Sequence, residues 1–169
     1  MHMRFHKITY PDVNNGLGCR ATLWIAGCSH HCEGCHNPET WSFMSGKEFT
    51  KEYEEKLFDI ISLPYMDGLT LSGGDPLDSF EDVIELVKRF REKFGNSKNI
   101  WLYTGYTMQE IHGNKFNEIL DYVDFIVDGR FELDKRDTTL AFRGSSNQNI
   151  YEKCGTHFLK SVLNQNDTL

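Results

Sequence analysis

Three cysteines, Cys28, Cys32 and Cys35, stand at the spacing C-x3-C-x2-C within one stretch of eight residues. A disulfide uses two thiols and leaves the third unpaired. A structural zinc site takes four ligands, usually from two C-x2-C pairs or from one such pair and two distant histidines. A [4Fe–4S] cluster has four irons, and thiolates are their usual ligands. Three cysteines on one loop would therefore hold three irons and leave the fourth open to a small molecule.

Two other kinds of metal site stay open at this point. A zinc site would need His30, His31 or His36 as its fourth ligand, although the tight spacing lacks the usual two-armed geometry. We expect His30 and His31 to be solvated loop residues instead. An electron-transfer iron–sulfur protein would need a fourth cysteine near the other three, whereas Cys19 and Cys154 stand apart and are typical of small apolar filler.

The composition narrows the class of protein. A length of 169 residues fits one domain spanning 1–169. A net charge of −7 argues against a surface for nucleic acid or for an anionic membrane. No apolar run is long enough to span a membrane, and residues 1–7 lack the apolar core of a signal peptide. We therefore expect a cytoplasmic protein, whose thiols stay free or bind metal.

Strand-like and helix-like segments alternate along the chain. A short edge strand is expected over 5–10. The main strands are expected over 20–26, 69–72, 100–104 and 123–128, and the helices over 50–62, 78–94, from 107, and 116–122. Asp78 with Glu81, and Thr107 with Glu110, resemble capping boxes. This alternation predicts an α/β fold with a mostly parallel sheet and right-handed crossovers. Four or five strands are too few to close a barrel of eight, so we expect an open, curved partial (βα) barrel.

Unusual residues follow each expected strand. They are the cysteine loop, Gly73-Gly74-Asp75-Pro76, Thr104-Gly105 and Asp128-Gly129. Parallel strands present their C-terminal ends on one edge, where active sites of such folds lie. Gly73 and Gly74 would let backbone approach a ligand closely, although Gly-Gly alone is typical of a tight turn. Asp128 could bind a ribose hydroxyl or belong to an Asp-Gly turn, and Thr104 is expected to be a turn residue beside the pocket.

These motifs resemble those of radical S-adenosylmethionine (SAM) enzymes, whose signature is C-x3-C-x2-C. The closer resemblance is to glycyl-radical activating enzymes, and among them to the subgroup that serves anaerobic ribonucleoside-triphosphate reductases. It covers most of the chain. It is carried by the three cysteines with His36-Asn37-Pro38-Glu39-Thr40-Trp41, by Ser72-Gly73-Gly74-Asp75-Pro76-Leu77, by residues 101–106 and 127–131, and by Arg143-Gly144-Ser145-Ser146-Asn147-Gln148.

The resemblance implies a set of cofactors and contacts. Cys28, Cys32 and Cys35 would ligate a [4Fe–4S] cluster, and SAM would chelate the open iron through its amino and carboxylate groups. Radical SAM enzymes commonly carry an aromatic residue before the third cysteine, and here Gly34 leaves that adenine contact to backbone atoms. The implied SAM-binding residues are Gly34, Cys35, His36, Gly73, Gly74 and Asp128.

The resemblance also implies an activity. SAM is cleaved reductively, and the resulting 5′-deoxyadenosyl radical generates a glycyl radical on the catalytic subunit of an anaerobic ribonucleotide reductase. A low-potential donor such as flavodoxin or ferredoxin would supply the electron. Another glycyl-radical enzyme, such as a pyruvate formate-lyase, is the alternative partner. The role of Arg143–Gln148 stays open between a surface loop and a partner contact.

Overall fold

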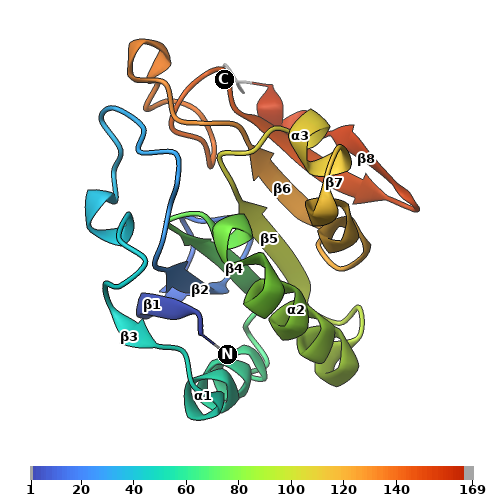
Figure 1. The fold of residues 1–169 in the computed structure, drawn as a ribbon. Coiled ribbons are helices and arrows are strands. Elements are labelled where there is room, and N and C mark those ends of the chain that lie inside the picture. Colours follow the sequence, from blue (N-terminus) through green and yellow to red (C-terminus); the bar gives the residue numbers. More distant parts are fainter. Residues whose placement is uncertain (1, 166–169) are drawn as a thin grey trace.

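The computed structural model describes residues 2–165, in which eight strands form one sheet in the order β3-β1-β2-β4-β5-β6-β7-β8 (Figure 1). The strands are β1 Arg4–Asp12, β2 Arg20–Ile25, β3 Lys47–Glu48, β4 Gly68–Gly73, β5 Asn99–Tyr103, β6 Phe125–Asp128, β7 Asn149–Cys154 and β8 His157–Lys160. The helices are α1 Lys51–Ile61, α2 Phe80–Phe94 and α3 Met108–His112, with 3₁₀ turns at Pro38–Thr40, Pro76–Ser79, Lys115–Asp121, Leu133–Lys135 and Val162–Asn164.

The centre of the sheet is parallel and its flanks are antiparallel. Strands β2, β4, β5 and β6 pair in parallel, as the alternating pattern predicted. β1 and β3 extend one edge antiparallel, and β7 and β8 extend the other. Only two residues join β7 to β8, and so short a connection permits only antiparallel pairing. The fold is therefore a mixed, open α/β sheet, and the expectation of a mostly parallel sheet holds for its central strands alone.

Apolar faces of the helices cover the parallel strands. Leu57 and Ile61 of α1, and Val83 and Val87 of α2, are fully buried, as their helical spacing requires. Figure 1 shows α2 lying across the central strands. No helix in the described part of the chain is both long and apolar enough to cross a membrane. The helical layer holds the strands rigidly and leaves their C-terminal ends free to build a site.

The start of α2 differs from the predicted capping box of Asp78 and Glu81. The chain already turns in the 3₁₀ segment Pro76–Ser79, where the Asp75 side chain accepts a bond of 2.9 Å from Leu77 N. Asp78 is therefore not the cap of α2, and its carboxylate bonds elsewhere. The capping box of Thr107 and Glu110 at α3 is confirmed. The helix expected over 116–122 is the 3₁₀ segment Lys115–Asp121.

Candidate functional site

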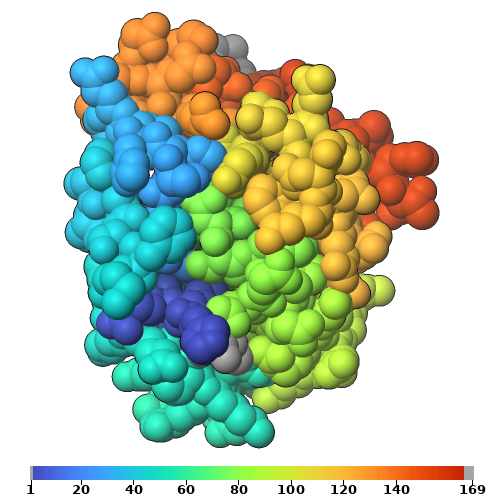
Figure 2. Space-filling view, viewed as in Figure 1, coloured from blue at the N-terminus to red at the C-terminus, as the bar shows by residue number. Residues whose placement is uncertain are grey.

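A cleft of about 460 Å³ opens where the parallel strands end. The cysteine loop, the turn after β4, the end of β5 and the segment after β6 all line it, as predicted for one shared edge. In Figure 2 the light-blue segment that carries the cysteines lies beside the green residues after β4 and near the orange segment past residue 130. The predicted site residues on its surface are Cys28, Cys32, Cys35, His36, Gly73 and Gly74.

All five cysteines are free thiols, three of them on the cleft wall. Cys28 is only 8% exposed, and burial raises the pKa of its thiol to about 11. Burial also raises the pKa of Cys32. Thiolates at these positions therefore need the positive charge of a metal group to offset their desolvation. The donor set is soft sulfur, which suits iron–sulfur chemistry.

The described residues contain no preformed site for a single metal ion. Among residues 2–165, no three His, Cys, Asp or Glu side chains gather closely enough to bind one metal ion. A zinc ion requires such convergence, because all of its ligands meet at one atom. In a [4Fe–4S] cluster each cysteine binds its own iron, so the thiols surround a larger volume.

The Gly73–Gly74 turn packs against the strand end that leads into the cysteine loop. Gly73 has a φ of 109°, and a Cβ on it would lie 2.3 Å from Ile25 O. A Cβ on Gly74 would lie 2.3 Å from Gly27 O. Gly74 N and Asp75 N donate to these same two carbonyls, at 2.8 Å each. Close packing within the protein therefore requires glycine at both positions, whether or not a ligand approaches the turn.

The His30 side chain is buried, so the expectation that it is a solvated loop residue was wrong. Its side chain is 4% exposed, and its Nε2 lies 2.7 Å from Oδ2 of Asp75, which is itself fully buried. Arg130 Nε donates to His30 Nδ1 at 3.0 Å. Because Nδ1 accepts, Nε2 carries the proton and donates it to Asp75. His31, by contrast, is exposed as predicted.

The Asp75 carboxylate also binds the residues that follow β5. Thr104 Oγ1 donates to it at 3.0 Å and Gly105 N at 2.8 Å. Thr104 is 6% exposed, so it is a buried partner of Asp75 as well as a residue at the cleft. Bonds between charged and neutral groups in a buried site are among the stronger ones in proteins.

Asp78 binds Ser29, which precedes His30 in the cysteine loop. Its carboxylate accepts bonds from Ser29 N at 2.7 Å, Ser29 Oγ at 3.1 Å and Tyr106 Oη at 2.7 Å. We call Asp75 and Asp78 the aspartate clamp. Together they attach the start of the cysteine loop to the residues that follow β4 and β5. Sequence reasoning missed this pairing because the partners lie 45 and 49 residues apart.

Two predicted SAM-binding residues lie off the cleft surface. Asp128 is 3% exposed, and its carboxylate accepts bonds from Met108 N at 2.9 Å and Asn149 N at 3.1 Å. It therefore braces the backbone behind the cleft wall. Gly34 has a φ of 74°, and a Cβ there would lie 2.8 Å from Leu133 Cδ1. His36 does line the cleft, and its ring lies 5.1 Å from that of Phe131.

The segment Arg143–Gln148 forms the far wall of the cleft. Gln148 Oε1 accepts bonds from Gly144 N at 2.9 Å and Ser145 N at 3.1 Å, and its Nε2 donates to Gly129 O at 2.9 Å. The amide side chain thus closes this loop and ties it to the residue after β6. The motif, for which the sequence offered no role, is a structural wall of the site.

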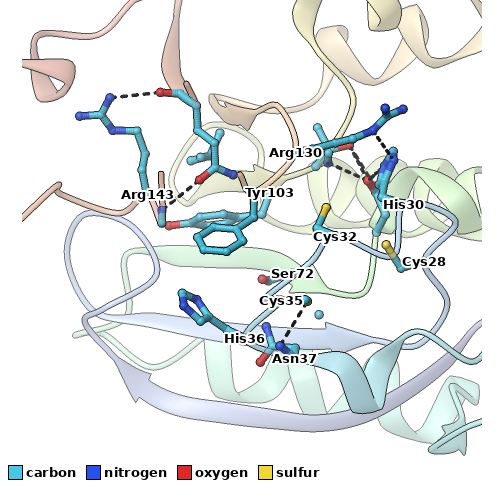
Figure 3. Close-up of a pocket in the computed structure, with 18 of the residues that line it drawn as sticks. Cys28, His30, Cys32, Cys35, His36, Asn37, Ser72, Tyr103, Arg130 and Arg143 are labelled. Carbon is cyan, nitrogen blue, oxygen red and sulfur yellow. Dashed lines mark hydrogen bonds and ion pairs between the residues drawn. The ribbon is translucent and has the colours of Figure 1, made fainter. Parts of the chain in front are cut away.

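Two polar atoms in this part of the cleft lack partners. The Tyr103 hydroxyl and the Arg143 Nε are buried, and neither has a hydrogen-bond partner among residues 2–165. An unsatisfied buried polar group costs about 1–3 kcal/mol. Figure 3 shows Tyr103 between Arg143 and the cysteines. Sequence reasoning did not identify Tyr103, which reads as an ordinary aromatic residue of a buried strand.

Comparison with known proteins agrees with this site. Residues 14–151 match the family model described as a 4Fe-4S single cluster domain. A protein of Salmonella typhimurium is 39% identical over 153 residues, covering 88% of this chain and 98% of its own. A Vibrio cholerae protein is 40% identical, covering 88% and 97%, and one of Enterobacteria phage T4 is 41% identical, covering 88% and 94%. The chain therefore belongs to the family that these three relatives represent, the anaerobic ribonucleoside-triphosphate reductase-activating proteins.

Proposed function

We propose that this protein activates an anaerobic ribonucleoside-triphosphate reductase by generating a glycyl radical on the reductase's catalytic subunit. One observation carries the proposal: three free thiols share a cleft with the Gly73–Gly74 turn. The same chain is about two-fifths identical to proteins named as activators of this reductase. The sequence motifs and the geometry therefore support the same reaction.

The cofactors are a [4Fe–4S] cluster and SAM. Cys28, Cys32 and Cys35 hold the cluster through their Sγ atoms. When bound, the cluster and SAM together supply a 5′-deoxyadenosyl radical by reductive cleavage of the C5′–S bond. Three cysteine ligands would leave one iron of the cluster without a protein ligand and so available to a chelating small molecule.

The residues around the cluster position SAM. Gly73 and Gly74 line the cleft, and carbonyls of this turn suit the methionyl ammonium. Cys35 and His36 border the remainder of SAM, and Gly34 contributes through the loop that carries them. Asp128 acts indirectly, since its carboxylate fixes the backbone amides behind the wall. The aspartate clamp holds the loop that carries Cys28, so the cluster has a fixed place beside this turn.

The wider assignment follows from the same reaction. Residues 1–169 form one radical SAM domain, a partial barrel built on the four parallel strands. Its open side admits a polypeptide segment of the reductase. The protein works in the cytoplasm, in keeping with its five free cysteines. A flavodoxin or a ferredoxin donates the electron.

Electron paramagnetic resonance tests the proposal. Anaerobically reconstituted protein, a reductant and SAM are mixed with the reductase or with a pyruvate formate-lyase. We expect a glycyl doublet on the reductase, absent when Cys32→Ala replaces the wild type. Formation of 5′-deoxyadenosine with no doublet on the reductase contradicts the proposal. A doublet on the formate-lyase alone would identify that enzyme as the partner.

A further inference from the structure

The cleft contains a hydroxyl that neither the cluster nor the fold uses. Tyr103, the last residue of β5, lines the cleft, and its hydroxyl is buried without a hydrogen-bond partner among residues 2–165. Burial raises the pKa of this phenol, so it stays protonated and can donate a hydrogen bond at neutral pH. A native fold rarely keeps such a group unless something outside the chain pairs with it.

A second donor lies on the same wall. Arg143 lines the cleft, and its Nη1 and Nη2 donate to the carbonyls of Gln148 at 3.1 Å and Asn164 at 3.3 Å. These two bonds fix the guanidinium plane, and the buried Nε is left without an acceptor in the described residues. The wall therefore offers two buried donors, at Tyr103 and Arg143, and no protein acceptor for either.

The residue that precedes Arg143 is held in a strained conformation. Phe142 has a φ of 56°, which is unfavourable for a residue other than glycine. Its ring lines the cleft and lies 5.3 Å from the ring of Trp101. Strain of this kind persists where the surrounding structure enforces it, often at a binding site. Here it keeps an apolar ring and Arg143 on the same face of the cleft.

We infer that Tyr103 and Arg143 form a subsite that binds main-chain carbonyl groups of the reductase segment carrying the target glycine. The inference rests on the proposed function. Glycine has no side chain, so a protein that must place one glycine α-carbon can hold only the peptide groups on either side of it. Peptide carbonyls are acceptors, and Tyr103 and Arg143 each offer a buried donor without a protein acceptor among the described residues. The ring of Phe142 gives the same segment an apolar surface to rest on.

Tyr103→Phe tests the subsite because it removes the hydroxyl and keeps the ring. We expect the KM for the reductase, measured from the rate of growth of the glycyl doublet, to rise about 10-fold, the factor expected for one hydrogen bond. Iron content and the Kd for SAM by calorimetry should match the wild type. The melting temperature should not fall, because no intramolecular bond is lost. Tyr65→Phe, at a side chain that is 58% exposed, is the matched control and should change none of these values.

Three results would overturn the inference in distinguishable ways. An unchanged KM for the reductase in Tyr103→Phe would leave the hydroxyl without a role in binding the partner. A weaker Kd for SAM would assign the hydroxyl to SAM instead of the peptide. A wild-type protein that cleaves SAM but never yields a doublet would remove the proposed function, and this subsite with it.

Discussion

The two halves of the cysteine loop are held in different ways. Its start is fixed: Cys28 N donates to Trp41 O at 3.0 Å, and Ser29 and His30 bond to the aspartate clamp. Its end is held within the loop and by the segment after β6. Cys35 N donates to Cys32 O within the loop itself, the Phe131 backbone N–H bonds to the Cys32 thiol, and the His36 ring packs against that of Phe131.

This difference suggests which cysteine positions are set by the protein and which by the cluster. The protein alone determines where Cys28 lies, because buried charge-assisted bonds resist displacement. Cys32 and Cys35 are half-exposed, and we expect the cluster to fix their positions relative to Cys28. Substitutions in the aspartate clamp should therefore disturb the start of the cysteine loop. Removal of the metal should mainly disturb its end.

The largest effect is expected at the cysteines. Cys28→Ala, Cys32→Ala or Cys35→Ala should each abolish the four-iron content and the visible absorbance of anaerobically reconstituted protein. Cys19→Ala and Cys154→Ala should retain both, since neither residue lines the cleft. Full iron content in Cys32→Ala, or its loss in Cys154→Ala, would contradict the assignment of ligands.

The second-largest effect is expected at the aspartate clamp. Asp75→Asn leaves a single acceptor oxygen and places an amide among the donors from His30, Gly105 and Leu77. We expect it to lower the free energy of unfolding of the metal-free protein by about 3 kcal/mol, measured by urea denaturation. The exposed Asp59→Asn is the control. Equal stability of the two variants would mean that the clamp contributes nothing before the cluster binds.

Gly74→Ala tests the close contact at the base of the loop. Its Cβ would fall 2.3 Å from Gly27 O, so the strand end must shift, at a cost of about 1–3 kcal/mol. Iron content should fall together with the melting temperature, since the displaced residue precedes Cys28. Gly113→Ala meets its nearest atom at 3.3 Å and serves as the control. An unchanged melting temperature in Gly74→Ala would show that the turn tolerates a side chain.

The smallest effect concerns a carboxylate that anchors a loop without any metal. Burial opposes ionisation of Asp12, but bonds from Thr22, Asn14, Asn15 and Thr9 outweigh it and lower its pKa. A lowered folded pKa stabilises the protein above the unfolded value near 3.8 and loses that contribution as the pH falls through the folded value. Asp12→Asn should cost about 1 kcal/mol at pH 7 and flatten the loss of stability below about pH 4.

In that experiment, the metal-free and cluster-loaded proteins should show the same Asp12 effect, because this loop is anchored without the cluster. A pH dependence at Asp12 that appears only with iron present would contradict the distinction between loops anchored by the protein alone and loops anchored by the cluster.

Local sequence patterns predicted much of the fold and the shared edge of the site, but not the aspartate clamp. The alternation of apolar residues identified β2, β4 and β5, and the order of strands and loops predicted that the three cysteines share a cleft with the Gly73–Gly74 turn. The assignment of Cys28, Cys32 and Cys35 as cluster ligands stays a prediction. His30 was expected to be solvated because its partner, Asp75, lies 45 residues further along the chain. Asp78 read as a helix cap because local spacing cannot reveal a competing acceptor site at Ser29. Tyr103 gave no signal, since a missing partner is visible only in three dimensions.

The central claim is that three cysteines ligate three of the four irons of the cluster and leave the fourth open to SAM. Mössbauer spectra of ⁵⁷Fe-reconstituted protein, recorded with and without SAM, test it most directly. We expect the signal of one iron in four to change when SAM is added, with the other three unaltered. Four equivalent irons that do not respond to SAM would contradict the claim, because they would show a fourth protein ligand or a cluster closed to SAM.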